Sequence, residues 1–153
     1  MICINSFQES TRVVNSRASS KAPLVWRRRQ GIESGITFTT YERPALSENK
    51  QIQLPNKKTD TFNLGRLILS IAASLGYDKR KAQYDSLWLA QTVEDKLSML
   101  PDELTPQLIA KVTYETLRQF DQIAAVQYGA RHHIVTPIKR RGRPSLSSSV
   151  SVK

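Results

Sequence analysis

Basic residues gather at the two ends of this chain, where their side chains could bind phosphate. Residues 1–30 contain six lysines and arginines against one glutamate, and residues 131–153 contain six basic residues and no acidic one. The guanidinium group of arginine is a planar fork of donors that matches the oxygens of a phosphate. Each phosphate neutralised in this way releases condensed counterions from a nucleic acid. The charge pattern therefore predicts contact with a nucleic-acid backbone, with solvated basic tails or an anionic membrane surface as the alternatives.

Between these ends the chain is close to neutral. Residues 31–60 carry four charges of each sign, and residues 61–130 carry seven basic and eight acidic residues, so the formal net charge of +10 comes from the ends. With 39% hydrophobic residues, the chain can bury a modest core. Its apolar runs fall far short of the roughly 18 residues that a membrane-spanning helix needs. Residues 1–20 also lack the apolar segment of a secretory signal.

The sequence contains no motif that is typical of an enzyme. Gly-x-Ser-x-Gly, a phosphate-binding P-loop and His-x-Glu are all absent from it, so we expect no catalytic residues. The single cysteine, Cys3, cannot form an intrachain disulfide, which fits a reducing cytosol. His132 and His133 are adjacent, point in different directions and make a poor metal pair. We expect them to belong to the end of the last helix.

Two predicted domains and a tail position the basic residues, in an α+β fold. Residues 1–46 have no helical periodicity, but the runs Thr11–Val14 and Ile36–Tyr41 are β-prone and predict a small β module. Residues 47–135 predict a mostly helical domain, a four-helix bundle with a small β cap. Residues 136–153 are basic and serine-rich, and we expect them to be disordered.

The helical domain is expected to open with one strand, in which Ile52 and Leu54 alternate with glutamines. Apolar residues then recur at helical spacing. The predicted helices run over Leu64–Leu75, over about Asp85–Met99, onward from the cap Thr105 and onward from the cap Asp121. Gly76 is a stop signal for the first helix, and Pro101 ends the second.

The N-terminal module resembles the zinc ribbon of NrdR, a bacterial repressor of ribonucleotide reductase genes. Residues Arg27–Glu42 lie over the family pattern Arg-Arg-Arg-x-Cys-x-x-Cys-Gly-x-x-Phe-Thr-Thr-Tyr/Phe-Glu. Met1–Ser6 lies over its Cys-x-x-Cys start, and Thr11–Arg17 lies over a Thr-Lys/Arg-Val-hydrophobic-Asp-Ser-Arg stretch. The spacing between these blocks matches as well.

This resemblance implies four zinc-ligand positions, which here hold Cys3, Ser6, Gly31 and Ser34. Structural zinc needs four thiolate or imidazole ligands. Serine hydroxyls stay protonated near neutral pH, and glycine has no side chain. We therefore expect no structural zinc, and we interpret Cys3 as a relic or a small buried hydrophobe.

The same resemblance implies that arginines of the module contact DNA. The matching positions are Arg12, Arg17, Arg27, Arg28 and Arg29. The alternative is that residues 27–29 are a leftover solvated run. Trp26 beside them could stack on a base, but plugging the small module is the favoured interpretation.

The tail adds a second candidate DNA contact. It consists of Lys139, Arg140, Arg141, Gly142, Arg143 and Pro144. This run resembles an AT-hook, whose Arg-Gly-Arg-Pro core lies in the narrow minor groove of AT-rich DNA. A generic basic tail is the alternative.

The second half resembles an ATP-cone, the nucleotide-binding module of NrdR and of ribonucleotide reductases. Phe62–Leu67 lies over Phe-Asp/Asn-x-x-Lys-Leu, and Phe120–Ala130 lies over the pattern of the last helix. The resemblance implies an ATP or dATP effector whose triphosphate is held by a basic strand and turn, although the family's Lys-Arg pair is missing from Ile52–Lys58. The residues expected to hold nucleotide are Asn56, Lys57, Lys58 and Arg66. The alternative is a helical domain kept only for oligomerisation.

Together these resemblances imply a homo-oligomeric, DNA-binding regulator of the bacterial cytosol. It would read ATP or dATP through the helical domain and change its oligomeric state. Two other functions stay open. One is a nucleotide-binding or oligomerisation module without an operator of its own, and the other is an architectural DNA binder that no longer senses nucleotide. We expect no contact with a membrane.

Overall fold

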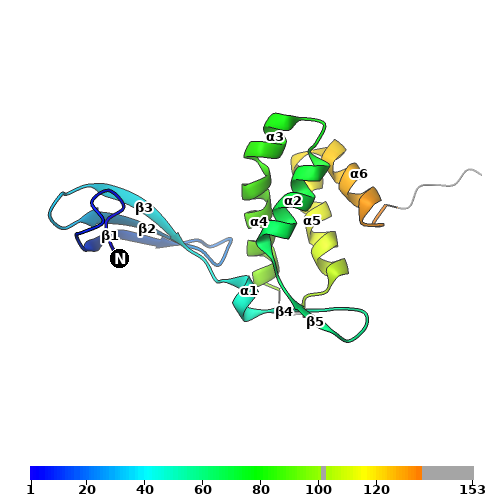
Figure 1. Cartoon of the computed structure of the whole chain (residues 1–153), viewed down its shortest axis with the longest axis horizontal. Helices are drawn as coiled ribbons and strands as arrows, with labels where there is room; N and C mark the ends of the chain where they lie inside the picture. The colour runs from blue at the N-terminus through cyan, green and yellow to red at the C-terminus, as the bar shows by residue number, and fades with distance from the viewer. Residues whose placement is uncertain (101–102, 136–153) are drawn as a thin grey trace, which may run out of the picture.

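The computed structural model describes residues 1–100 and 103–135. It consists of an N-terminal sheet and a helical part, which a short connection joins (Figure 1). In this connection the guanidinium of Arg43 lies 3.4 Å from a carboxylate oxygen of Asp95 in the helical part. The predicted α+β class is confirmed, because a small antiparallel sheet is followed mainly by helices.

The N-terminal sheet is antiparallel, and its strands lie side by side in chain order. It comprises β1 (Thr11–Ala18), β2 (Val25–Gly31) and β3 (Thr37–Glu42). The two β-prone runs of the sequence overlap β1 and β3, whereas the arginine run forms the central strand β2. The register slips between Val13 and Asn15, where a bulge interrupts the pairing of β1.

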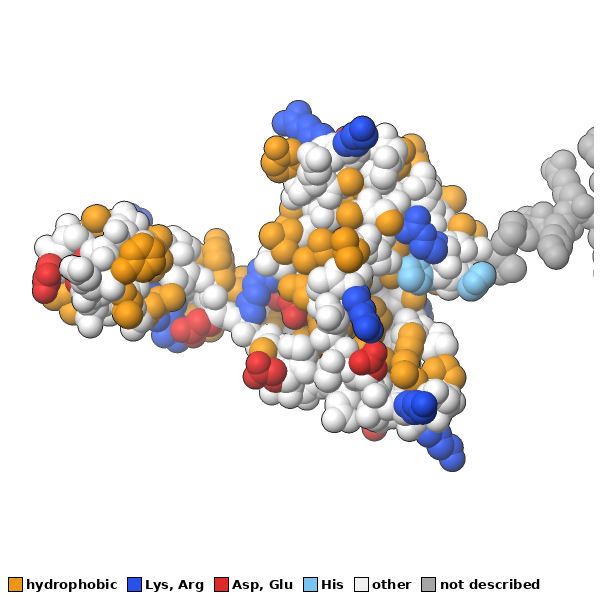
Figure 2. All heavy atoms as spheres, in the orientation of Figure 1, with side chains coloured by type: hydrophobic (Ala, Val, Ile, Leu, Met, Phe, Trp, Pro, Cys, Tyr) orange, Lys and Arg blue, Asp and Glu red, His pale blue; other side chains and the backbone are white. Residues whose placement is uncertain are grey.

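The helical part begins with a short helix and a hairpin. The elements are α1 (Leu46–Asn49), β4 (Gln51–Gln53), β5 (Thr59–Thr61), α2 (Leu64–Ser74), α3 (Lys79–Tyr84), α4 (Ser86–Ser98), α5 (Pro106–Phe120) and α6 (Gln122–Arg131). The predicted helices correspond to α2, α4, α5 and α6. The prediction of one strand before them was incomplete, because residues 46–61 form a helical turn and two paired strands. The surface of this part mixes basic and acidic side chains, as its near-neutral charge requires (Figure 2).

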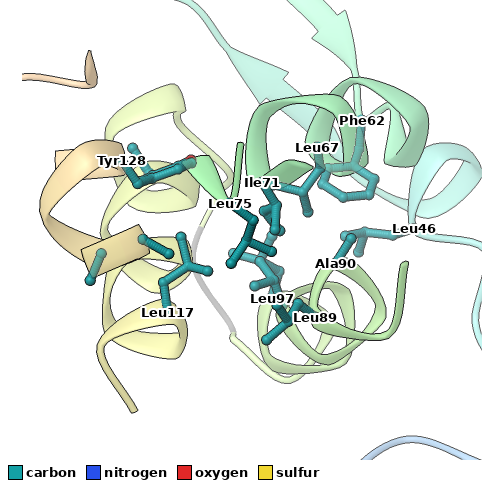
Figure 3. Packing of buried hydrophobic residues seen from close by; sticks show 14 of the residues in the cluster. Leu46, Phe62, Leu67, Ile71, Leu75, Leu89, Ala90, Leu97, Leu117 and Tyr128 are labelled. Carbon is teal, nitrogen blue, oxygen red and sulfur yellow. The ribbon is translucent and has the colours of Figure 1, made fainter. Parts of the chain in front are cut away.

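Buried hydrophobic side chains hold the helices and the hairpin together (Figure 3). Leu67 and Ile71 of α2 face Ala90 of α4, and Leu46 lies close to Phe62 at the hairpin end of this cluster. Each fully buried leucine contributes roughly 1.5–3 kcal/mol relative to exposure. The cluster therefore positions the hairpin against the helices. Among the described residues, none of the helices is both long and apolar enough to cross a bilayer.

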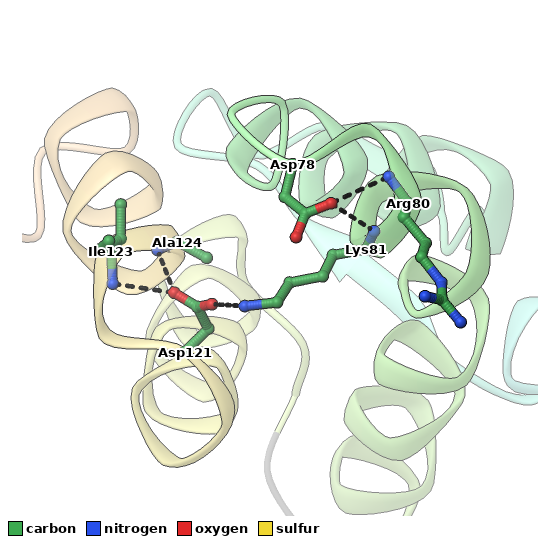
Figure 4. A network of polar contacts seen from close by, with 6 residues as sticks. All are labelled: Asp78, Arg80, Lys81, Asp121, Ile123 and Ala124. Atoms are coloured by element: carbon green, nitrogen blue, oxygen red, sulfur yellow. Dashed lines mark hydrogen bonds and ion pairs between the residues drawn. The ribbon is translucent and has the colours of Figure 1, made fainter.

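Two aspartates cap helices, and one of them also joins α3 to α6 (Figure 4). Asp78 accepts hydrogen bonds from the backbone N–H groups of Arg80 and Lys81 at 3.0 and 3.2 Å, which starts the unpredicted helix α3. Asp121 accepts from two backbone N–H groups of α6, both at 3.0 Å, and lies 2.7 Å from Nζ of Lys81. Burial alone would raise the pKa of Asp121, but hydrogen bonds from Lys81, from Tyr77 and from the helix start hold that pKa below its ordinary value.

Replacing Asp121 by alanine should lower the free energy of unfolding of the helical part by about 2–3 kcal/mol, because a lost helix cap typically costs about 1–2 kcal/mol and the contact with Lys81 is lost as well. Because the pKa of Asp121 is lowered in the folded state, this stabilisation is complete at neutral pH and is lost only as the pH falls below the ordinary range of an aspartate. Urea unfolding followed by circular dichroism measures the loss. The control is Asp78→Ala, which removes the cap of α3 but keeps the contact between Lys81 of α3 and Asp121. An equal loss of unfolding free energy in Asp78→Ala would contradict a contribution from the contact between α3 and α6.

Candidate nucleic-acid interface and nucleotide pocket

The strand register places three of the predicted DNA-contacting arginines on one face of the sheet. Arg12 pairs with Gln30 and Arg17 pairs with Trp26. Directly paired residues share a face, and residues 26, 28 and 30 share a face because side chains alternate along a strand. Arg28 therefore lies on the same face as Arg12 and Arg17. We call these three residues the arginine face.

The arginine face keeps its positive charge available to a ligand. Two nitrogens of the Arg12 guanidinium donate to the side-chain oxygen of Gln30 at 2.9 and 3.3 Å, and Arg28 donates to the Thr37 hydroxyl at 3.3 Å. Both acceptors are uncharged. None of the ion pairs within residues 1–100 and 103–135 involves Arg12, Arg17 or Arg28. A phosphate approaching this face would not compete with a bound carboxylate.

Arg27 and Arg29 lie on the opposite face of the sheet, beside a carboxylate. A guanidinium nitrogen of Arg27 is 2.9 Å from one carboxylate oxygen of Glu42, and one of Arg29 is 3.9 Å from the other. The Arg29 side chain is only 13% exposed, and its Nε donates to the Thr40 hydroxyl at 3.4 Å. These contacts tie β2 to β3. The sheet thus divides the five arginines that the sequence grouped together.

The remaining candidate DNA contacts are an aromatic residue of the sheet and the basic tail. Trp26 is half buried in the sheet, while Tyr41, which pairs with it from β3, is 61% exposed. An exposed ring next to the arginine face is suited to stacking on a base. The tail residues Lys139, Arg140, Arg141 and Arg143 lie outside the described residues.

A cavity of about 340 Å³ opens between the β4–β5 hairpin and helices α2, α5 and α6. Its lining is mainly apolar and includes Ile52, Leu54, Phe62, Leu67, Ile109 and Ala110. On the α6 side the rings of Tyr128 and His132 are stacked, with their centroids 4.2 Å apart. The cavity can therefore accept a flat, largely apolar group.

Polar groups at the rim of this cavity are already paired with one another. Arg66, whose side chain is 75% exposed, places Nη1 3.2 Å from Oδ2 of Asp60. The Ser70 hydroxyl lies 3.0 Å from Nε2 of His132. Burial, with a smaller effect from the neighbouring Arg131, lowers the pKa of His132, so its ring is neutral near pH 7. Arg66 is thus the one permanent cation among the described residues that line the cavity.

Of the residues predicted to hold nucleotide, Arg66 lines the cavity. Asn56, Lys57 and Lys58 lie in the exposed turn between β4 and β5 and are not part of the lining. The side-chain oxygen of Asn56 accepts from the backbone N–H of Lys58 at 3.2 Å, and Lys57 has a φ of 61°. The hydrogen bond within the turn stabilises its conformation. Lys57 and Lys58 would have to reach a ligand from outside the cavity lining.

Comparisons with known proteins find similarity over most of the chain. The family model described as the transcriptional repressor NrdR-like N-terminal domain, a zinc ribbon, matches residues 1–42. A transcriptional repressor NrdR of Ligilactobacillus salivarius is 29% identical over 132 residues, which cover 85% of this chain and 82% of the relative. One from Thermus thermophilus is 28% identical over 141 residues, which cover 92% and 89%. The N-terminal module is thus similar to the NrdR zinc ribbon. Because the two matches cover 85% and 92% of the chain, its similarity to these relatives extends beyond the ribbon into the helical part.

The zinc site implied by the similarity to the ribbon does not fit the residues of this chain. Of the four ligand positions only Cys3 offers a thiolate, and it is fully buried. Ser6 and Ser34 are poor zinc ligands, and Gly31 provides none. Within the described part of the chain, no group of three or more His, Cys, Asp or Glu side chains is placed to hold a metal ion.

Sequence reasoning missed Asp60 and Ser70 at the cavity, and it placed His132 only at the end of the last helix. His132 does end α6, but its ring also lines the cavity. Its spacing of four residues from Tyr128 puts both rings on one side of the last helix, which was an available signal. Asp60 and Ser70 carried no comparable pattern.

Proposed function

We propose that this protein is a DNA-binding transcriptional repressor whose arginine face contacts the DNA backbone. The observation that carries the proposal is the gathering of Arg12, Arg17 and Arg28 on one face without a carboxylate partner in the described residues. The names of the relatives, transcriptional repressor NrdR, support it. Arg27 and Arg29 would act mainly by holding β2 against β3. The basic tail would provide a second anchor, since a tether raises the local concentration of a weak contact.

We propose that residues 1–46 bind DNA and that residues 47–135 bind the effector. ATP or dATP would place its base in the apolar cavity, near the stacked rings of Tyr128 and His132. Arg66 would exchange Asp60 for a phosphate. An effector that binds one oligomeric state better than another shifts the population toward that state. The nucleotide would thereby control how arginine faces are presented to DNA.

A mobility-shift experiment on sheared DNA of the source organism tests the proposal, with and without millimolar ATP or dATP. We expect a subset of fragments to stay bound at a salt concentration that releases the rest, and we expect nucleotide to change that retention. Retention of all fragments alike, unaffected by nucleotide, would favour an architectural DNA binder. Nucleotide binding without retention of any fragment would favour a module that has no operator of its own.

A further inference from the structure

The four ligand positions of the ribbon surround the carboxylate of Glu9. The Ser34 hydroxyl donates to Oε1 of Glu9, and the Ser6 hydroxyl lies 3.4 Å from the same oxygen. The backbone N–H groups of Glu33 and Ser34 donate to Oε2 at 2.7 and 2.9 Å. Glu9 itself is only 6% exposed. An almost buried carboxylate in such a small module is stable only because its lone pairs are used.

The two turns that would carry the ligands keep matching backbones on either side of this carboxylate. The carbonyl of Cys3 accepts from the N–H of Phe7 at 3.0 Å, and the carbonyl of Gly31 accepts from the N–H of Gly35 at 3.2 Å. Phe7 and Gly35, which close the turns, have φ values of 55° and 69°. A left-handed conformation is costly for a bulky residue such as Phe7. Surrounding contacts must therefore hold its turn in place.

Gly31 makes room for the carboxylate. A Cβ at this position would lie 2.8 Å from the carboxyl carbon of Glu9 and 2.5 Å from the Ser34 hydroxyl oxygen. Such approaches are far closer than ordinary van der Waals contact, and the backbone and the buried carboxylate leave little freedom to relax. The side chain of a cysteine at position 31 and the carboxylate of Glu9 could not both fit as they stand. The inward position of the Glu9 carboxylate therefore requires that position 31 has no side chain, and so no ligand.

We propose that the Glu9 carboxylate has replaced zinc as the link between the two turns, and that the ribbon of this protein folds without metal. The negative charge strengthens each hydrogen bond that it accepts. Hydrogen bonds from Ser34, from its hydroxyl first and then its backbone N–H, hold the pKa of Glu9 at about 2 against the effect of burial. The carboxylate is therefore ionised at neutral pH. The fold of the module then does not depend on zinc supply.

Hydrogen exchange on the full chain, read amide by amide by NMR, tests this proposal. We expect Glu9→Gln to lower the protection of the Glu33 and Ser34 amides and of the β1–β3 amides by at least tenfold, because an amide cannot accept at both positions. The helical part serves as the internal reference. Glu33→Gln is the matched control, since it makes the same chemical change at an exposed neighbour, and it should leave protection unchanged.

Two further measurements address the metal and the space at Gly31. Protein refolded with excess zinc and then dialysed should contain no stoichiometric zinc, and a chelator should leave its exchange pattern unchanged. Gly31→Ala should reproduce the loss seen in Glu9→Gln. About one zinc per chain whose removal unfolds the sheet would overturn the proposal, and so would wild-type protection in both variants.

Discussion

Replacing Arg12, Arg17 and Arg28 together by alanine should weaken DNA binding by about a thousandfold. Each arginine is expected to bind a backbone phosphate, and a charge-assisted hydrogen bond contributes roughly 1.5–3 kcal/mol. Because about 1.4 kcal/mol corresponds to a tenfold change, the lower end of this range at three positions gives the expected factor. The slope of the logarithm of the binding constant against the logarithm of salt concentration, which is negative, should also become less negative by about three. Fluorescence anisotropy across a salt series measures both quantities.

The matched control removes the same charge from the helical part. Lys79, Arg80 and Lys111 are exposed there, and replacing them by alanine should change affinity and salt slope only slightly. An equal loss in this control would mean that overall charge, and not the arginine face, drives binding. The pair Arg27→Ala with Arg29→Ala separates the two faces of the sheet. We expect a smaller change in salt slope there, since Glu42 already neutralises part of that charge.

The sequence predicted the helices better than the strands, for a physical reason. A helix such as α5 is predicted by local signals: a cap at Thr105, a proline at Pro106 and an apolar stripe. Strand β2 contains three consecutive arginines and little β-branched character, so no local signal predicts it. It becomes a strand because β1 and β3 pair with it on both sides. Helix α3, with six residues, is too short for a clear periodic pattern.

The candidate sites depended even more on contacts between distant residues. Which arginines share a face is set by the register and by the bulge between Val13 and Asn15, neither of which the sequence reveals. Had β2 been recognised as a strand, its alternation alone would have separated Arg28 from Arg27 and Arg29. Glu9 went unnoticed because its partners at Glu33 and Ser34 are more than 20 residues away along the chain. The four ligand positions, by contrast, followed directly from the family pattern.

The cavity explains why charge at a single position should dominate effector binding. On the strand side of the cavity, Ile52 and Leu54 are apolar and β5 contributes Asp60 and Thr61, so no basic residue of the described strands lines it. Lys57 and Lys58 stay in the exposed turn. In the proposed complex Arg66 would therefore be the main cation near the triphosphate, and in this structure it is paired with Asp60 at 3.2 Å. Nucleotide binding as proposed would have to break this pair before the guanidinium could contact a phosphate.

Arg66→Ala should accordingly weaken ATP or dATP binding by about ten- to a hundredfold, the cost of roughly 1.5–3 kcal/mol for a lost charge-assisted contact. The side chain is 75% exposed, so the helical content should be unchanged. Isothermal titration calorimetry without divalent cations measures the effect, and Lys57→Ala is the control that removes a charge outside the lining. Equal binding by wild type and Arg66→Ala would contradict the role of Arg66. Absence of binding by wild type at millimolar nucleotide would refute effector sensing itself.

Asp60→Asn should act in the opposite direction and tighten binding by about two- to fivefold. The substitution keeps the side-chain oxygen that accepts from the Thr61 N–H at 2.8 Å, so the local backbone is preserved. It removes the negative charge that now holds Arg66, and an exposed pair of this kind is worth up to roughly 1 kcal/mol. It also removes repulsion between a carboxylate and the incoming phosphates. Opposite signs for Arg66→Ala and Asp60→Asn would identify competition for one guanidinium, whereas weakening in both would mean that Asp60 itself contacts the nucleotide.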